Sequence, residues 1–297
     1  MTEAFPNDTP QQRAFRAFET LVAGEDMVID LSLAALLIAN LEYPELDIAH
    51  YMAQLDALAE RVRALLGLTG AGTPEQLPVN MDVPTVIAAM NTVLFGQEHF
   101  HGNTEDYYNS SNSFLNEVLE RHTGIPIALS LLYMEVGRRV GVWFDGIGLP
   151  FHFVVGCRFQ QKRIYIDPFE SGRVLSEQEC RRRVRQVIGK KDKIPTQWFE
   201  PVSRKYLLIR MLNNLKHIYL HSEDYARALR ICDCILVLAP RSPQERRDRG
   251  VIYLQLKRYG RALSDLAAYL QLAPLAEDHD EIQRQVKMIR QILAMMN

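Results

Sequence analysis

The C-terminal third of the chain repeats itself at an interval of 34 residues. A shift of this length superimposes four groups of identical residues: Ile218-Tyr219-Leu220 on Ile252-Tyr253-Leu254, Tyr225 on Tyr259, Arg227-Ala228-Leu229 on Arg261-Ala262-Leu263, and Leu238-Ala239-Pro240 on Leu272-Ala273-Pro274. Each interval accommodates two helices, and the closing proline ends the second helix because proline has no N–H to continue it. Such units bury their apolar faces only by stacking on one another, so we expect an all-helical repeat.

The interval and its residue types are typical of tetratricopeptide repeats. Tyr219 and Tyr253 are expected to fill the groove between paired helices, and both are candidate binding residues. Gly250 occupies a position where a small residue lets two helices approach closely, although Lys216, one period earlier, is large. We expect repeats of this type over residues 205–297, closed by a helix that caps the exposed end.

The composition is that of a soluble globular protein, with 47% apolar and 24% charged residues in a chain of 297. The longest strongly apolar stretch, Leu31–Leu41, is much shorter than the ~20 residues that a membrane span needs. The N-terminus lacks the basic start and apolar block of a signal peptide. Four cysteines without a Cys-x-x-Cys pair do not form a disulfide framework, so we expect a reducing, cytoplasmic compartment and no membrane contact.

Charge is distributed unevenly along the chain. The net charge is −2, yet residues 1–100 hold 14 acidic and 4 basic side chains. Several cations gather in one segment: Arg181-Arg182-Arg183, Arg185, Lys190-Lys191 and Lys193. Such a run suggests nucleic-acid binding, but it contains no aromatic side chain that could stack on bases. A solvated face, or a contact with the acidic N-terminal third, explains it better, so nucleic acid is not an expected partner.

Hydrophobic periodicity predicts helices in the first third and a helix followed by strands in the middle. Helices are expected at 11–22, 30–41, 47–66, 83–95, 112–119 and 127–140, with a loop at 71–78. The period then falls to two, which favours strands at 151–159 and 163–166. Gln160 and Gln161 separate these strands, so we expect a hairpin whose second strand ends at Asp167-Pro168.

The motifs in the middle of the chain follow one another in a familiar order. A helix, a strand bearing His152 and a strand ending at Asp167 have the order of the transglutaminase-like core of the papain-type superfamily. Six short motifs resemble those of the SirB-type transglutaminase-like proteins: Glu42-Tyr43-Pro44, Asn112-Ser113-Phe114-Leu115-Asn116, Gly124-Ile125-Pro126-Ile127, Gly148-Leu149-Pro150-Phe151-His152-Phe153, Asp167-Pro168-Phe169 and Arg247-Asp248-Arg249-Gly250. The resemblance covers about residues 25–275.

This resemblance implies an α+β fold. N-terminal helices and a helix-plus-antiparallel-sheet core would form a transglutaminase-like domain over 1–200, with a helical subdomain at about 1–98. An all-helical repeat segment would follow, because proteins of this family likewise end in tetratricopeptide-type repeats. One position departs from the family pattern: glycine is expected before the histidine, but Phe151 stands there and could narrow access to the imidazole.

The resemblance also implies a catalytic triad, whose first member is missing. In active relatives a cysteine at the helix N-terminus attacks an amide carbonyl, and a histidine and an aspartate assist it. His152 and Asp167 match the second and third members, but the expected helix start at 124–128 holds no cysteine. On one strand, Cys157 would face away from His152 because an odd number of residues separates them.

The other thiols and hydroxyls are poor substitutes for that cysteine. Cys180 lies on a basic helix, and Cys232 and Cys234 lie in a repeat helix, where cysteine usually packs as a small apolar residue. Thr123 and Ser130 carry hydroxyls near the expected position. A hydroxyl needs a neighbouring base to become a nucleophile, so we expect neither to take this role.

Each candidate residue also has a structural interpretation. His152 and Asp167 could bond to each other and hold two strands together, and Asp167 could cap the turn at the end of its strand. Asn112 and Asn116 lie one helical turn apart, on one face. Their side chains could bind a ligand, or they could anchor the backbone at 124–127.

Neither a metal nor a cofactor is expected. His99 and His101 would face the same way on a strand, and Asp106 or His122 could join them. No compact ligand motif is present, however, so these residues do not predict a metal site.

We interpret the chain as a non-catalytic transglutaminase-like protein. Its cleft and its repeat groove would bind a protein or peptide, because tetratricopeptide units build concave surfaces. Two alternatives stay open. His152 and Asp167 could be the acid–base pair of a cysteine-independent enzyme that acts on an amide or related substrate. Residues 181–193 could instead bind nucleic acid with a steep salt dependence.

Overall fold

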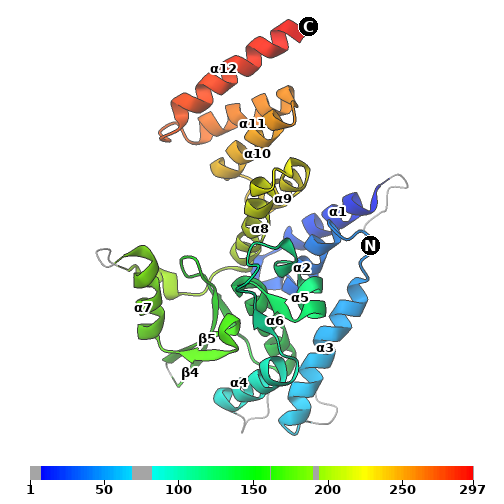
Figure 1. Ribbon diagram of the computed structural model, residues 1–297, viewed down its shortest axis with the longest axis vertical. Coiled ribbons are helices and arrows are strands. Elements are labelled where there is room, and N and C mark those ends of the chain that lie inside the picture. The colour runs from blue at the N-terminus through cyan, green and yellow to red at the C-terminus, as the bar shows by residue number, and fades with distance from the viewer. Residues whose placement is uncertain (1–7, 69–81, 161, 190–193, 297) are drawn as a thin grey trace. The chain divides into compact units, whose positions relative to one another are not determined.

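The computed structural model describes residues 8–68, 82–160, 162–189 and 194–296. The chain divides into two compact units, Met1–Met211 and Leu212–Asn297. Helices and a small antiparallel sheet build the first unit, and helices build the described part of the second (Figure 1). The expected α+β fold with an all-helical C-terminal segment is confirmed.

Most helices of the first unit lie where the periodicity predicts them. They are α1 (Pro10–Val22), α2 (Leu31–Asn40), α3 (Ile48–Leu65), α4 (Val83–Asn91), α5 (Leu115–Arg121) and α6 (Pro126–Val140). A further helix, α7 (Glu177–Ile188), carries much of the basic run, and its bounds are not predicted by the periodicity. Asp30, Asp47 and Asp82 each accept a hydrogen bond from the backbone N–H three residues later. These caps satisfy donors that the first turn leaves free and so fix three helix starts. The loop expected at 71–78 lies outside the described residues.

Two of the predicted helices are interrupted. A π-helical turn, η2 (Thr92–Gln97), follows α4 in place of the continuous helix expected over 83–95. The helix expected over 112–119 is divided into a 3-10 turn, η3 (Ser110–Asn112), and α5, because the backbone at Phe114 is extended. Apolar periodicity does not detect such local breaks.

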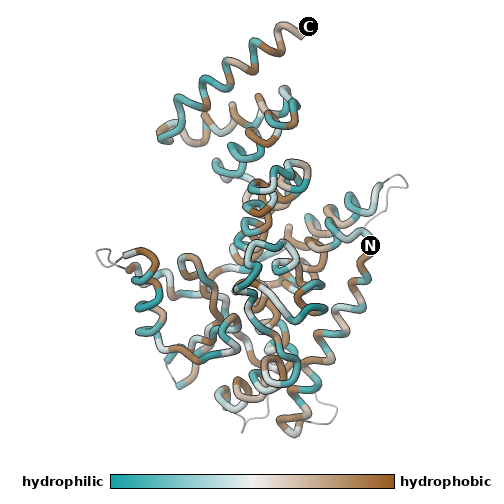
Figure 2. Tube along the Cα trace, in the orientation of Figure 1, coloured by the Kyte–Doolittle hydropathy of each residue, from teal (hydrophilic) through white to brown (hydrophobic). Residues whose placement is uncertain are grey.

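The buried helix α6 is the centre of the first unit. All but two of its fifteen residues are buried, and α2, α3 and α5 pack around it. α6 begins at Pro126, whose missing N–H is not needed in a first turn. It ends before Gly141, which has a φ of +101° that an L-residue rarely adopts. Figure 2 shows α2 as a largely hydrophobic segment, as expected for a second buried helix.

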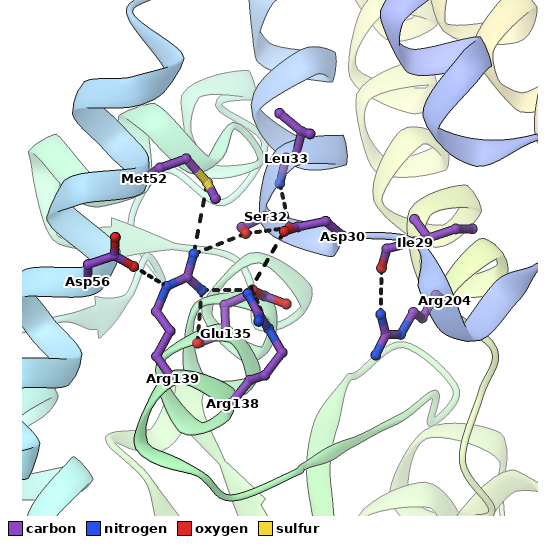
Figure 3. A network of polar contacts seen from close by, with 10 residues as sticks. All are labelled: Ile29, Asp30, Ser32, Leu33, Met52, Asp56, Glu135, Arg138, Arg139 and Arg204. Atoms are coloured by element: carbon purple, nitrogen blue, oxygen red, sulfur yellow. Dashed lines mark hydrogen bonds and ion pairs between the residues drawn. The ribbon is translucent and has the colours of Figure 1, made fainter. Parts of the chain in front are cut away.

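A buried ionic network joins α2, α3 and α6 (Figure 3). Arg139 of α6 donates to Glu135 one turn earlier at 2.8 Å, to Asp56 of α3 at 2.6 Å and to Ser32 of α2 at 3.3 Å. Arg139, Glu135 and Ser32 are all buried. Because a buried charge is costly unless it is paired, this network restricts how the three helices can pack.

Four antiparallel strands form a sheet in the order β3-β4-β5-β6. They are β3 (Asp145–Ile147), β4 (Val154–Phe159), β5 (Lys162–Asp167) and β6 (Arg173–Leu175). β4 and β5 form the expected hairpin, with Arg158 directly opposite Arg163. β4 begins at Val154, later than predicted, because Phe151 has a φ of +57° that interrupts the extended backbone. His152 therefore precedes the strand rather than lying on it.

Helix α7 packs on one face of this sheet (Figure 1). Its Cys180 and Val184 are buried in a cluster with Tyr165 of β5 and Leu175 of β6. Further members of the cluster are Ile147, Leu149, Val154, Ile194 and Phe199. This packing decides which arginines of α7 face the sheet and which face solvent.

The second unit is a row of helices. They are α8 (Arg204–His221), which begins in the first unit, α9 (Tyr225–Leu238), α10 (Pro243–Gln255), α11 (Tyr259–Leu272) and α12 (His279–Met296). A Cβ at Gly250 would come within 2.7 Å of the Leu266 side chain, so glycine is needed where α10 and α11 meet. At the equivalent position Lys216 is buried, but its Nζ binds Glu245 at 2.6 Å and Asp248 at 2.8 Å. Ion pairs thus compensate for this departure from the repeat pattern.

Candidate functional site

The imidazole of His152 is oriented by a buried carboxylate. Its Nε2 lies 2.8 Å from Oδ2 of Asp167, the last residue of β5. Asp167 is completely buried, and the His152 side chain is 23% exposed. Because an ionised carboxylate only accepts hydrogen bonds, Nε2 donates, and Nδ1 of a neutral imidazole keeps a free lone pair. Nδ1 has no hydrogen-bond partner among the described residues.

Asp167 also ends its strand, as its place before Pro168 suggests. Its Oδ1 accepts from the backbone N–H groups of Phe169 at 3.1 Å and Glu170 at 3.3 Å, which caps the turn η4 (Pro168–Glu170). Burial alone would raise the pKa of the Asp167 carboxyl. The hydrogen bond from His152 and the nearby cationic groups outweigh burial and lower that pKa below its usual value. One carboxylate therefore serves both the turn and the imidazole.

Arg183 of α7 is the site residue that sequence reasoning misses. Its Nη1 donates to Oδ2 of Asp167 at 2.6 Å, and its Nη2 donates to Glu170 at 2.5 Å. The interpretation of the basic run as a solvated face is therefore wrong for this residue. Helical spacing could have indicated that Arg183 faces the sheet, because Arg183 adjoins Val184 and lies three residues after Cys180, and both of these residues face the sheet. Lys190, Lys191 and Lys193 lie outside the described residues.

An aromatic side chain packs against the imidazole, and a second one packs against the first. Phe169 packs edge-on against His152, with ring centroids 6.1 Å apart, and Tyr107 packs edge-on against Phe169 at 6.4 Å. Phe151, which is expected to narrow access to the imidazole, is itself 81% exposed. Its positive φ explains why glycine suits the position before the histidine.

None of the four cysteines is hydrogen-bonded to His152. All four are free thiols and buried. Burial raises the pKa of Cys157 to about 11 and that of Cys180 to about 12, and it also raises those of Cys232 and Cys234. These thiols are therefore protonated at neutral pH. Cys157 is expected to face away from His152 on a shared strand, but His152 is not on β4, so this expectation does not apply. No hydrogen bond joins any of these thiols to the imidazole.

The two hydroxyls near the start of α6 bond elsewhere. Oγ of Ser130 is buried and donates to the carbonyl of Phe153 at 3.4 Å. Oγ1 of Thr123 donates to the carbonyl of Arg121 at 3.0 Å and lies 3.3 Å from Nε2 of His101. Neither hydroxyl is hydrogen-bonded to His152 within the described ranges.

Asn112 and Asn116 do not share a helical face. Asn112 ends η3, whereas Asn116 belongs to α5, so the expected one-turn spacing is wrong. Both residues are buried. The Asn112 side chain donates to the carbonyl of Asp106 at 2.6 Å and accepts from Asn103 at 3.0 Å. Because these groups are satisfied internally, a ligand-binding role for Asn112 is not supported.

The backbone anchoring expected of these asparagines exists in a different form. The main-chain carbonyl of Asn112, not its side chain, accepts from the N–H of Ile125 at 3.1 Å. Oδ1 of Asn116 is buried and has no hydrogen-bond partner among the described residues. The hydrogen bond between Ile125 and the carbonyl of Asn112 therefore holds the segment just before α6 in place.

The remaining candidates are packing residues. Tyr219 and Tyr253 are buried between helices, with the guanidinium groups of Arg227 and Arg249 near their rings at 5.7 Å each. Their rings are thus not offered to a partner, and the binding role expected for them is not supported. His122 lies 3.9 Å from Glu98, but the described parts of the chain contain no cluster of three metal-binding side chains.

Comparison with known proteins identifies both parts of the chain. Residues 49–213 match the family described as the transglutaminase-like superfamily, and residues 215–291 match the tetratricopeptide repeat. The chain belongs to the transglutaminase-like superfamily. A UPF0162 protein of Xylella fastidiosa is 35% identical to this transglutaminase-like protein over 92% of the chain and 94% of its own length. A UPF0162 protein of Vibrio cholerae is 34% identical over 61% of the chain and 67% of its own length.

A relative of different size shares the transglutaminase-like part. F-box only protein 21 of Homo sapiens is 32% identical over 58% of the chain but only 29% of its own length. No solved structure matches this transglutaminase-like protein. In the described residues, no helix combines the length and apolar character that crossing a membrane would require.

Proposed function

We propose that this transglutaminase-like protein is a non-catalytic scaffold that binds a protein or peptide beside His152 and along its repeats. The observation that supports this most is the state of the thiols, since all four are buried and none is bonded to His152. Acyl transfer through a thiolate therefore has no nucleophile next to the imidazole. A cytoplasmic location is part of this proposal, and the four unpaired thiols support it.

The side chains around His152 are suited to peptide binding. Phe151 and Tyr108 are 81% and 78% exposed, and Tyr107 and Phe169 extend the aromatic group to the imidazole. Exposed aromatic side chains supply large apolar area with few rotatable bonds, and such residues often dominate binding energy.

Phe151 combines a strained backbone with an exposed aromatic ring. A left-handed backbone costs a non-glycine residue about 1–2 kcal/mol, and its exposed ring gains nothing from burial. A partner that covers the ring would supply the burial energy that the exposed ring lacks. Strained residues of this kind concentrate at sites that clamp ligands.

Peptide selection tests the proposal. Peptides selected from a displayed random library on the wild-type protein are expected to bind the Phe151→Ala variant about tenfold more weakly, as for a central aromatic contact. Trp143→Ala, which removes another exposed aromatic ring of the same unit, should change the affinity little. Equal binding to wild type and Phe151→Ala, or no peptide above background, would contradict the proposal.

One observation favours a second function. His152 keeps an unpartnered Nδ1 while Asp167 holds Nε2, the arrangement of a histidine that can accept a proton. The alternative is an acid–base enzyme that acts on an amide or related substrate without a covalent intermediate. His152→Ala would then abolish activity and leave Tm nearly unchanged. A large fall in Tm would instead support a structural role for the imidazole.

A further inference from the structure

Two hollows lie next to each other on the hairpin β4–β5 and α7. The first has a volume of about 390 Å³ and is lined by Arg158, Lys162, Arg163, Tyr165, Glu177 and Glu200. The second has a volume of about 400 Å³ and is lined by Gln178, Arg181, Arg182 and Arg185. Glu177 of the first hollow forms an ion pair with Arg181 of the second at 2.7 Å. The two hollows therefore share this border.

The residues around the hollows carry an excess of positive charge. Six cations face two carboxylates, which leaves a net charge of +4 in a chain whose net charge is −2. Both carboxylates already bind a cation, because Glu177 pairs with Arg181 and Glu200 pairs with Arg163 at 3.2 Å. Within the described ranges, four cations take part in no ion pair: Arg158, Lys162, Arg182 and Arg185.

The register of the hairpin sets two cations against each other in the first hollow. Arg158 and Arg163 are directly opposite, so their side chains leave the same face of the hairpin. Like charges at this spacing repel. Glu200, which pairs with Arg163 at 3.2 Å, and Asp145, whose carboxylate both arginines attract, offset part of this repulsion. Nε of Arg163 is buried and has no hydrogen-bond partner among the described residues. The side chain of the exposed Arg158 takes part in no hydrogen bond or ion pair within the described ranges, so its guanidinium group offers unused donors in the first hollow.

Helix α7 presents cations to solvent at the second hollow. Cys180 and Val184 face the sheet, whereas Arg182 and Arg185 are exposed. Arg182 and Arg185 are three residues apart, a spacing at which like charges on a helix repel. Figure 2 shows hydrophilic residues along much of α7. Both hollows therefore carry cation pairs that an acidic ligand would stabilise.

We propose that the hairpin β4–β5 and α7 form a docking surface for an acidic segment of a partner protein, whose carboxylate side chains enter the two hollows. Arginine suits this role because a guanidinium group binds a carboxylate through two parallel hydrogen bonds. Docking would remove the repulsion between Arg158 and Arg163 and between Arg182 and Arg185. The surface does not use His152, so it stands whether or not the proposed function beside the imidazole is correct.

Nucleic acid fits this surface less well. Tyr165, the aromatic residue that lines the first hollow, is buried and cannot stack on bases, and no aromatic residue among those described lines the second hollow. The side chains of Glu177 and Glu200 are 51% and 64% exposed, and they would repel a continuous phosphate backbone that crossed the border. Separate carboxylate side chains can enter the hollows on either side of that border.

Fluorescence anisotropy with a labelled peptide of alternating Glu and Gly tests the docking surface on the full chain. We expect binding that weakens as salt rises, and no binding of the same peptide with Gln in place of Glu. The double variant Arg182→Gln/Arg185→Gln and the single variant Arg158→Gln should each weaken binding about tenfold or more. The double variant Arg284→Gln/Arg290→Gln makes the same charge change at exposed positions of α12 and should change the affinity less than about twofold.

Charge reversal gives an independent outcome. Arg182→Glu/Arg185→Glu should lose the Glu peptide and bind a peptide of alternating Lys and Gly instead. The proposal is overturned if the Glu peptide does not bind, if the Gln peptide binds equally well, or if the α12 variant loses as much affinity as the α7 variant. It is also overturned if a mixed-sequence single-stranded oligonucleotide binds more tightly than the Glu peptide through the same arginines.

Discussion

Arg183 and His152 donate to the same carboxylate oxygen, Oδ2 of Asp167, at 2.6 and 2.8 Å. Since the other oxygen of Asp167 caps η4, one buried side chain connects the end of β5, the segment before β4 and helix α7. Arg183 acts on the imidazole only through this carboxylate. It is therefore a positioning residue, in contrast to the solvated role that its place in a basic run suggests.

Loss of Arg183 is expected to destabilise the first unit. Arg183→Gln leaves the buried Asp167 carboxylate with one cationic partner fewer, and hydrogen bonds to charged groups contribute about 1.5–3 kcal/mol. Trp143 and Trp198, the two tryptophans, both lie in this unit, so urea unfolding followed by tryptophan fluorescence reports on it. Arg182→Gln removes the exposed neighbour and should cost less than about 0.5 kcal/mol. Equal costs for the two variants would show that Arg183 does not hold Asp167.

Asp167 is expected to make the first unit sensitive to acid. Burial raises the pKa of its carboxyl, but the hydrogen bond from His152 and the nearby cations lower it below the ordinary value. A carboxylate with a lowered folded-state pKa contributes stability that is present above its unfolded pKa of about 3.9 and is lost as pH falls through the folded value. Asp167→Asn should therefore flatten the pH dependence of the unfolding free energy below about pH 4. An unchanged slope in urea titrations at several pH values would contradict this.

The backbone of Phe151 gives a prediction of the opposite sign. Phe151→Gly relieves a left-handed conformation at the cost of a more flexible unfolded chain, so we expect a gain of about 0.5–1 kcal/mol in unfolding free energy. Phe151→Ala removes the same exposed ring but keeps the strained φ, and it should bring no gain. The difference between the glycine and alanine variants in urea unfolding isolates the backbone. No difference between them would mean that position 151 carries no strain.

For the ionic network of Figure 3, we expect two substitutions together to lower the free energy of unfolding less than one of them does alone. Glu135→Leu leaves the buried guanidinium of Arg139 without its buried carboxylate partner, because its other partner, Asp56, is 66% exposed, and this loss should cost roughly 3–5 kcal/mol. Adding Arg139→Met removes the buried charge that Asp56 alone then compensates and should restore most of the stability, because a well-packed apolar pair can replace a buried ion pair. Fluorescence-detected urea unfolding measures both. A double variant less stable than Glu135→Leu would contradict this explanation.

Most of the fold is predictable because its helices are long and periodic. The helices expected at 30–41 and 47–66 are one residue longer at each end than α2 and α3, and the helix expected at 127–140 starts one residue after α6. The 34-residue interval predicts the paired helices of the second unit. Short elements are not predictable in this way: β3 and β6 have three residues each, too few to show a period.

The site is predictable only in part. The hydrogen bond between His152 and Asp167 follows from the expected hairpin and from the family resemblance. The role of Arg183 does not follow from the sequence, because Arg183 lies 16 residues beyond Asp167 and is one of several arginines in α7. Only the packing of α7 on the sheet determines which of these arginines contacts Asp167. The left-handed backbone of Phe151 is equally hidden, since every residue type except glycine disfavours it.

The absence of thiol chemistry beside His152 is the central claim, and turnover measured together with thiol labelling tests it most directly. The folded full chain is incubated with a glutamine peptide and a primary amine, and separately with a thiol-directed probe, beside the His152→Ala variant. We expect no amide product above buffer and no labelling that depends on the imidazole, because all four thiols are buried. Product formation, or labelling of any cysteine that is lost in His152→Ala, would contradict the claim.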